Sequence, residues 1–343
     1  MAIATSPSHS DRKLRKVSMF GTKSGLRTIA AIISITLAAS VGISLPANAA
    51  DAYSASVTFL AKSFGANKQA ITLYESQQDG ITLEAMVQLA AAGKTIEKQL
   101  PAVKYMLLNP EQPLGTKNSG YLFNPDKTLK MGLAGKFLFA SEALGVANNS
   151  VRYKLYKKLV AKIDASTGEI SLTTSGAMDY AWVALGLHSY QEYTLANKVI
   201  SGMIKLQNAD GGFSAWDPTV SNIDGTGLVL QALNLAPTRA SAAAIASRAA
   251  AEKKAVAYLK KSDSVDGSNW ESEGAASVNS TAYAAMGLKA AGKNIDKYVA
   301  WLKTQLVSKG GFKSPYSNGA GDVFATSQAL ALLYGKTYLT IGY

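Results

Sequence analysis

The feature that most constrains the fold of this 343-residue chain is an apolar segment that recurs six times. One copy runs from Thr226 to Leu233 and is small or apolar at nearly every position. The other copies occupy residues 82–89, 137–144, 178–185, 281–288 and 326–333. Their closing leucines lie 41 to 55 residues apart, which is the spacing of repeat architectures. The chain is therefore expected to repeat one structural unit.

Amphipathic segments alternate with the apolar ones, for example at residues 96–108, 150–163, 195–207, 251–261 and 295–306. Each carries an apolar stripe at helical spacing and a charged face. A helix that is apolar on all sides belongs inside, and one with a charged face belongs outside. The pattern predicts an all-α fold of six helical hairpins, an (α/α)6 toroid with inner helices around a central funnel. An open solenoid is the alternative, but its last repeat should be polar, and residues 324–334 are as apolar as the middle copies.

The connections between the segments also repeat. Glycine followed by an aromatic residue ends the linkers at residues 208–213, 264–270 and 308–312. Glycine supplies the positive φ that reverses a chain after a helix, and the aromatic can fill the groove between hairpins. Phe213, Trp270 and Phe312 are therefore predicted to be packing residues. The alanine-rich stretch 240–251 is predicted to extend an outer helix or its connection, and not to link two domains.

The first 49 residues have the pattern of a signal peptide. Six basic residues precede the apolar stretch 29–45. Ala47, Asn48 and Ala49 follow this stretch shortly afterwards and form a small-residue cleavage site. An uncleaved anchor is the alternative, but polar residues and Pro46 leave the apolar run short for a bilayer. The predicted division is a signal peptide at 1–49 and the toroid at 50–343, with no transmembrane segment after cleavage. The protein is expected to be secreted.

Charge and cysteine content narrow the functional classes. The net charge is +12, and about +7 remains beyond the leader. The basic residues are scattered and do not cluster with aromatics, so nucleic acid is not an expected partner, whereas loose attraction to an anionic cell wall is compatible. The chain has no cysteine, which excludes disulfides and a lipoprotein anchor.

Polar residues gather where the inner helices are expected to start. Asp, Asn, Ser and Thr are good N-cap residues, but a helix needs only one, and two of the segments carry several. Because the inner helices should all start at one end, the surplus suggests a polar ring that faces a ligand. Aromatic residues accompany it. The predicted ligand-binding residues are Asp79, Asp179, Tyr180, Trp216, Asn222, Asp224, Thr226, Asn279, Tyr283, Tyr316 and Asp322.

Residues 203–213 and 298–312, each followed by a helix with a Thr start and a Leu end, resemble the repeats of the prenyltransferase and squalene cyclase superfamily. That resemblance covers about residues 53–340 and implies the α/α toroid. The cobalamin carriers, the complement thioester domain and some polysaccharide lyases share this fold, so the resemblance specifies fold and not function.

The chemistry of individual members can be tested against the sequence. Protein prenyltransferases bind zinc through Asp, Cys and His, whereas this chain has no Cys and, beyond its leader, only His188. A thioester domain also needs a cysteine. Class II terpene cyclases protonate an alkene with the middle acid of a D-x-D-D box. The matching stretch here, residues 222–225, keeps that acid as Asp224 but lacks the flanking ones.

The stretch 221–226 is also similar to the S-V-D-T helix start of the cobalamin carriers. Those carriers grip a corrinoid between the toroid and a β-rich domain, which this sequence does not contain. The leading hypothesis is binding of a bulky amphipathic ligand at the funnel mouth without catalysis. The ligand could be a corrinoid; no other cofactor and no metal is expected. A separate β-rich capping protein or a cell-surface component would be the partner.

Three alternatives stay open. A carbohydrate-active enzyme, a lyase or hydrolase, could use acids that face each other across the funnel, such as Asp179 with Asp322 or Asp224 with Asp79. A degenerate terpene cyclase-like enzyme would use Asp224 as its acid. An interaction module would have a funnel that is plugged by side chains. The sequence does not decide whether any catalysis occurs.

Overall fold

The computed structural model describes residues 53–64, 71–73, 76–93, 122–124, 126–145, 150–171 and 176–341. All of them belong to one compact unit, residues 45–343. The predicted signal peptide and the amphipathic segment at 96–108 lie outside the described residues.

Six inner helices correspond to the six apolar segments, and most of their residues are buried. Each begins one to six residues before its segment. They are α3 (Asp79–Ala91), α5 (Met131–Ala143), α7 (Ala177–Ser189), α9 (Ile223–Leu233), α11 (Val278–Ala290) and α13 (Val323–Leu333).

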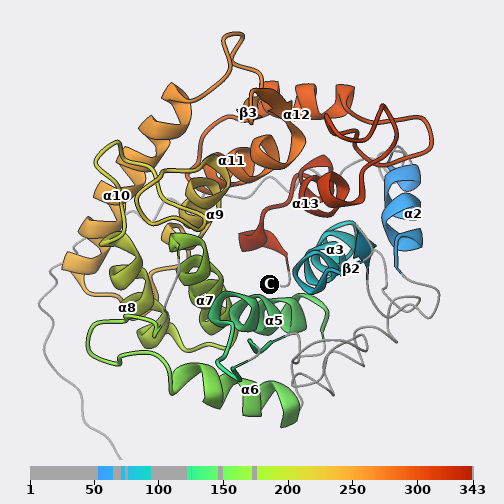
Figure 1. Cartoon of the computed structure of the whole chain (residues 1–343). Helices are drawn as coiled ribbons and strands as arrows, with labels where there is room; N and C mark the ends of the chain where they lie inside the picture. Colours follow the sequence, from blue (N-terminus) through green and yellow to red (C-terminus); the bar gives the residue numbers. More distant parts are fainter. Residues whose placement is uncertain are drawn as a thin grey trace, which may run out of the picture. The chain divides into compact units, whose positions relative to one another are not determined.

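The inner helices form a closed ring (Figure 1). Each contacts the next along the chain, and α13 returns to contact α3. At this closing contact the Gln88 side chain on α3 accepts a hydrogen bond from the Ala331 N–H and donates one to the Gln328 carbonyl at 3.4 Å. The closed toroid is confirmed, and the open solenoid is excluded.

The outer helices cover the ring. They are α2 (Ser54–Lys62), α6 (Ser150–Val160), α8 (Tyr193–Ile204), α10 (Ala242–Lys261) and α12 (Asp296–Thr304). Each packs on an inner helix, and α2 bridges α13 and α3. The alanine-rich stretch forms the first half of α10, so its assignment to an outer helix is confirmed.

One backbone-to-threonine hydrogen bond recurs around the ring. The N–H of a buried apolar residue in the connection donates to the threonine hydroxyl in the first turn of the next inner helix. The pairs are Ile71 with Thr82 (3.0 Å), Phe213 with Thr226 (2.8 Å), Trp270 with Thr281 (3.0 Å) and Phe312 with Thr326 (2.9 Å). Phe213, Trp270 and Phe312 have no exposed surface, which confirms that they pack between hairpins.

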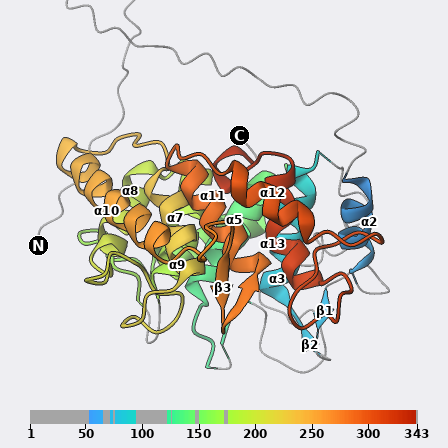
Figure 2. The ribbon, with the colours of Figure 1, turned by 90° about the horizontal axis from the view of Figure 1, so that it is seen from above.

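Two short hairpins precede inner helices. Strands β1 (Thr72–Leu73) and β2 (Ser76–Gln77) pair antiparallel before α3, and β3 (Trp270–Ser272) and β4 (Ala275–Ser277) do so before α11. Figure 2 shows both hairpins at the end where the inner helices begin. After α13 the chain turns back at the other end, in the 3-10 helix η2 (Tyr338–Thr340).

Candidate functional site at the mouth of the ring

The mouth is defined here as the end of the ring at which the inner helices begin. The second residues of these helices form its first level: Gly80, Gly132, Met178, Asp224, Asn279 and Phe324. The sixth residues lie one turn deeper on the same helix faces and form the second level: Glu84, Lys136, Trp182, Leu228, Tyr283 and Gln328. Asp224 and Asn279 are half-buried and Phe324 is 42% exposed, whereas Glu84 is 1% exposed. Solvent therefore reaches the first level and is nearly excluded from the second.

Glu84 is the centre of the second level. Its carboxylate accepts hydrogen bonds from the Tyr283 hydroxyl and from Gln328 Nε2 at 3.0 Å. Lys136 Nζ lies 3.4 Å from Glu84 Oε1 and 4.6 Å from the centroid of the Trp182 ring. A buried carboxylate is tolerated because these partners replace the water that it has lost. The network joins residues of five of the inner helices.

Asp224 lies above this network on the first turn of α9. Its Oδ1 is buried and has no hydrogen-bond partner in the part of the chain that the structure describes. Burial raises the pKa of the Asp224 carboxyl to about 6; the negative charge of Glu84 adds to the effect, and a hydrogen bond with Ser280 opposes it. Around neutral pH this group can exist as a carboxylic acid and can donate a proton or a hydrogen bond.

Asn279 of the first level and Tyr283 of the second level lie one turn apart on α11, the helix after the one that carries Asp224. Asn279 Nδ2 donates to Gln328 Oε1 at 2.6 Å. Tyr283 is 2% exposed, and burial raises the pKa of its hydroxyl well above the usual value. Of the residues predicted from the sequence, Asp224, Asn279 and Tyr283 are thus gathered around Glu84.

Exposed aromatic side chains occupy the loops at the mouth. Trp216, in the loop before α9, is 66% exposed, and Tyr316, in the loop before α13, is 69% exposed. The Tyr316 hydroxyl donates to Glu273 Oε2 at 2.6 Å, which ties its loop to the β3–β4 hairpin. Large exposed aromatics at one end of the ring are typical of a binding surface.

Four predicted residues have structural roles instead. Thr226 is fully buried, and its hydroxyl contacts backbone groups of Phe213 and Asn222. Tyr180 is 7% exposed and stands where other repeats have threonine, since its hydroxyl accepts the Ile170 N–H at 3.3 Å. The side chains of Asn222 and Asp322 cap α9 and α13. The capping and packing uses of these residues explain their polarity without a ligand.

Asp79 and Asp179 are half-buried in the first turns of α3 and α7. Asp179 lies against the start of α5, where a Cβ on Gly132 would be 1.9 Å from its carboxylate. The acid whose charge raises the pKa of Asp224 is Glu84, which was not among the expected acid pairs.

Sequence reasoning missed Glu84, Lys136, Gln328 and Tyr338. A signal for the first two was present, because Glu84 is a charged residue inside the apolar segment 82–89 and Lys136 directly precedes the segment 137–144. Both stand six residues into their helices, so aligning the repeats by helix start would have placed them together. Tyr338 follows the last repeat and has no counterpart to align with.

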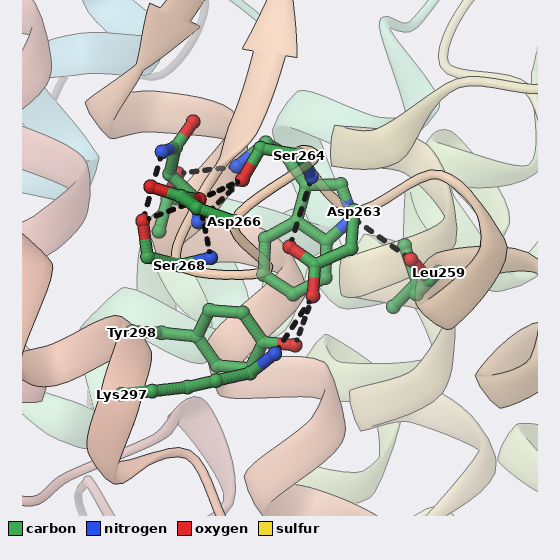
Figure 3. Close-up of polar contacts among 10 residues, drawn as sticks. Leu259, Asp263, Ser264, Asp266, Ser268, Lys297 and Tyr298 are labelled. Carbon is green, nitrogen blue, oxygen red and sulfur yellow. Dashed lines mark hydrogen bonds and ion pairs between the residues drawn. The ribbon is translucent and has the colours of Figure 1, made fainter.

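A hollow of about 570 Å³ lies away from the mouth, between α10, α11 and α12. At its edge Asp263 accepts hydrogen bonds from Lys297 Nζ (2.9 Å) and the Tyr298 hydroxyl (2.8 Å), as Figure 3 shows. Burial, together with the Asp263 bond, raises the pKa of Tyr298 to about 12. Asp266 holds the adjacent loop by accepting from Ser264 and Ser268. These groups satisfy one another, and none of the predicted ligand-binding residues lines this hollow.

Two kinds of feature are absent from the described residues. No group of three or more histidine or acidic side chains is placed to hold a metal ion, and no helix there has the length and hydropathy needed to cross a bilayer.

Comparison with known proteins places this geometry in a fold. No family model and no curated protein matches the sequence. A type II terpene cyclase, MstE from Scytonema, matches with a TM-score of 0.58 and 15% identity over 84% of this chain and 97% of its own. An unsaturated glucuronyl hydrolase from Bacillus sp. GL1 matches with a TM-score of 0.56 and 13% identity over 86% and 98%. The chain has the α/α toroid fold. At these identities the likeness to enzymes specifies the fold alone.

Proposed function

We propose that the mouth of the toroid binds a bulky amphipathic organic molecule. The observation that carries the proposal is the buried, unpartnered Oδ1 of Asp224, at the end of the ring where Trp216 and Tyr316 are exposed. A buried polar atom without a partner costs free energy, and a bound ligand would supply the missing hydrogen bond. Aromatic faces at the rim would cover the apolar part of the same molecule.

A corrinoid is the leading example of such a ligand. It combines a broad macrocycle, which suits the aromatic rim, with peripheral amides that can bond to Asp224 and Asn279. Secretion, which the leader at residues 1–49 supports, and a separate β-rich capping partner remain parts of this proposal.

Binding can be tested with hydroxocobalamin, a soluble oligosaccharide and a prenyl alcohol as probes. We expect one of them to raise the melting temperature of the protein and to titrate saturably in calorimetry. Trp216→Ala and Asp224→Asn should each weaken that binding about tenfold or more. Tyr153→Ala is the matched control, because Tyr153 is 53% exposed on the outer helix α6. If none of the three probes binds, or if the mouth variants behave like the control, the proposal fails.

Acid catalysis at Asp224 is the second candidate function, and the pKa of about 6 favours it. A neutral carboxyl could protonate a glycosidic oxygen or an alkene in a bound substrate. Glu84, however, is already held by Lys136, Tyr283 and Gln328, so a free second carboxylate is not at hand beside it. Ligand binding without turnover is therefore the function that we propose ahead of acid catalysis. Release of reducing ends from a polysaccharide, lost in Asp224→Asn and declining as the pH rises above 6, would reverse that order.

A further inference from the structure

The segment that follows α13 enters the ring from the end opposite the mouth. Gly335, with a φ of 65°, reverses the chain, and the Lys336 N–H returns to the Ala331 carbonyl at 3.0 Å. Reciprocal bonds between Thr337 and Thr340 then close a capping box around η2. Figure 1 shows this segment inside the circle of inner helices.

Tyr338 is the residue of this segment that reaches the centre. It has no exposed surface. Its N–H donates to Gln231 Oε1 on α9 at 2.9 Å. Its ring centroid lies 5.1 Å from that of Trp182 on α7 and 5.7 Å from that of Phe139 on α5. Through its backbone N–H and its ring, Tyr338 thus contacts three of the inner helices.

The Tyr338 hydroxyl also meets the network below the mouth. It lies 3.5 Å from Glu84 Oε1, the same oxygen that accepts the Tyr283 hydroxyl. Glu84 and Trp182 belong to the second level, so Tyr338 occupies the axis of the ring immediately behind that level. Tyr338 follows the last inner helix and so comes from outside the repeats.

We propose that Tyr338 is a specificity-determining residue that closes the ring axis behind Glu84 and so limits how deep a ligand can enter from the mouth. This inference rests on the proposed function for its meaning. A ligand would stop at the level of Glu84, Lys136 and Tyr283. A smaller residue at position 338 would extend the site into the space between Phe139 and Trp182.

The test uses phenol and the full chain carrying Tyr338→Ala, which keeps the Cβ of the tyrosine and removes its phenol group. The substitution should lower the melting temperature by about 7 °C, because it empties a space the size of a phenol ring. At five times its Kd, phenol should recover about 2 °C and quench the fluorescence of the neighbouring Trp182. It should leave the wild-type protein unchanged.

Phe312→Ala is the matched control, because Phe312 is also fully buried but packs between hairpins, away from the axis. It should lose stability without recovery by phenol. A folded Tyr338→Ala that does not bind phenol would overturn the proposal, and so would equal recovery of Phe312→Ala.

Gln231→Leu decides the question if Tyr338→Ala does not fold. It keeps the buried volume and removes the acceptor of the Tyr338 N–H. Saturating phenol should then compete with the Tyr338 ring for the axis and speed amide exchange in residues 337–341 at least tenfold; unchanged exchange would count against the proposal. These outcomes do not involve Asp224. Loss of mouth binding in Asp224→Asn therefore tests the proposed function separately.

Discussion

At the scale of single residues, Asp224 should leave a measurable trace in the pH dependence of stability. Its pKa is about 6 in the folded protein against an ordinary value of 3.8, so the folded state holds the proton more tightly. The resulting stabilisation is complete below pH 3.8 and is lost as the pH rises through 6. Because a tenfold change in proton affinity is worth about 1.4 kcal/mol, the loss is roughly 3 kcal/mol at most. Asp224→Asn cannot titrate, so its stability relative to wild type should rise by up to that amount between pH 4 and pH 7, measured by urea denaturation. A constant difference across this range would show that the carboxyl titrates normally.

At the scale of elements, the glycines decide how closely inner helices approach. A Cβ on Gly227 of α9 would lie 2.4 Å from the backbone of Tyr283 on α11, whereas one on Gly80 of α3 would have its nearest neighbour at 3.8 Å. Replacing glycine by alanine inside a helix gains up to about 1 kcal/mol from helix propensity. That gain should appear, in part, in Gly80→Ala. In Gly227→Ala the overlap is with backbone that cannot rotate away, so a loss of about 3 kcal/mol is expected instead. Thermal unfolding of the two variants should therefore shift in opposite directions; similar shifts would mean that α9 and α11 are not in such close contact.

The elements were also the part of the structure most open to prediction. Apolar segments such as 226–233 allowed the inner helices to be predicted, because a helix that is apolar on all sides has to be buried. The threonines that begin these segments were read as caps or ligand contacts. Thr226 instead accepts a backbone N–H from the preceding connection, a contact across 13 residues that no local pattern reveals. The Tyr180 hydroxyl makes the equivalent contact with a longer side chain, since it accepts the Ile170 N–H, and this contact could not be predicted for the same reason.

At the scale of the whole molecule, the sequence predicted the ring and its mouth but not what fills the centre. The repeat pattern predicted Asp224 and Asn279 at one end of the ring, because equivalent positions in the inner helices lie at the same distance from the mouth. Glu84 follows the same rule and was overlooked, although a charge within an apolar segment needs a partner. Lys136, which directly precedes the segment 137–144, was overlooked with it. Tyr338 could not have been placed, because its position depends on how a non-repeating segment folds back after the ring has closed.

Closure itself has a consequence that an open array of repeats would not share. Gln88 on α3 accepts the Ala331 N–H of α13 at the contact between the first and last inner helices. Gln88→Leu keeps the volume but leaves that bond unmade, at a cost of about 1–3 kcal/mol, or roughly 5- to 150-fold in the unfolding equilibrium. In an open array, each repeat is supported only by its neighbours, so the loss would stay near the ends. In a closed ring that unfolds as one unit, α7 should lose hydrogen-exchange protection by the same factor as α3, although it lies on the opposite side. If protection falls in α3 and α13 while α7 keeps its own, the ring does not behave as a single cooperative unit.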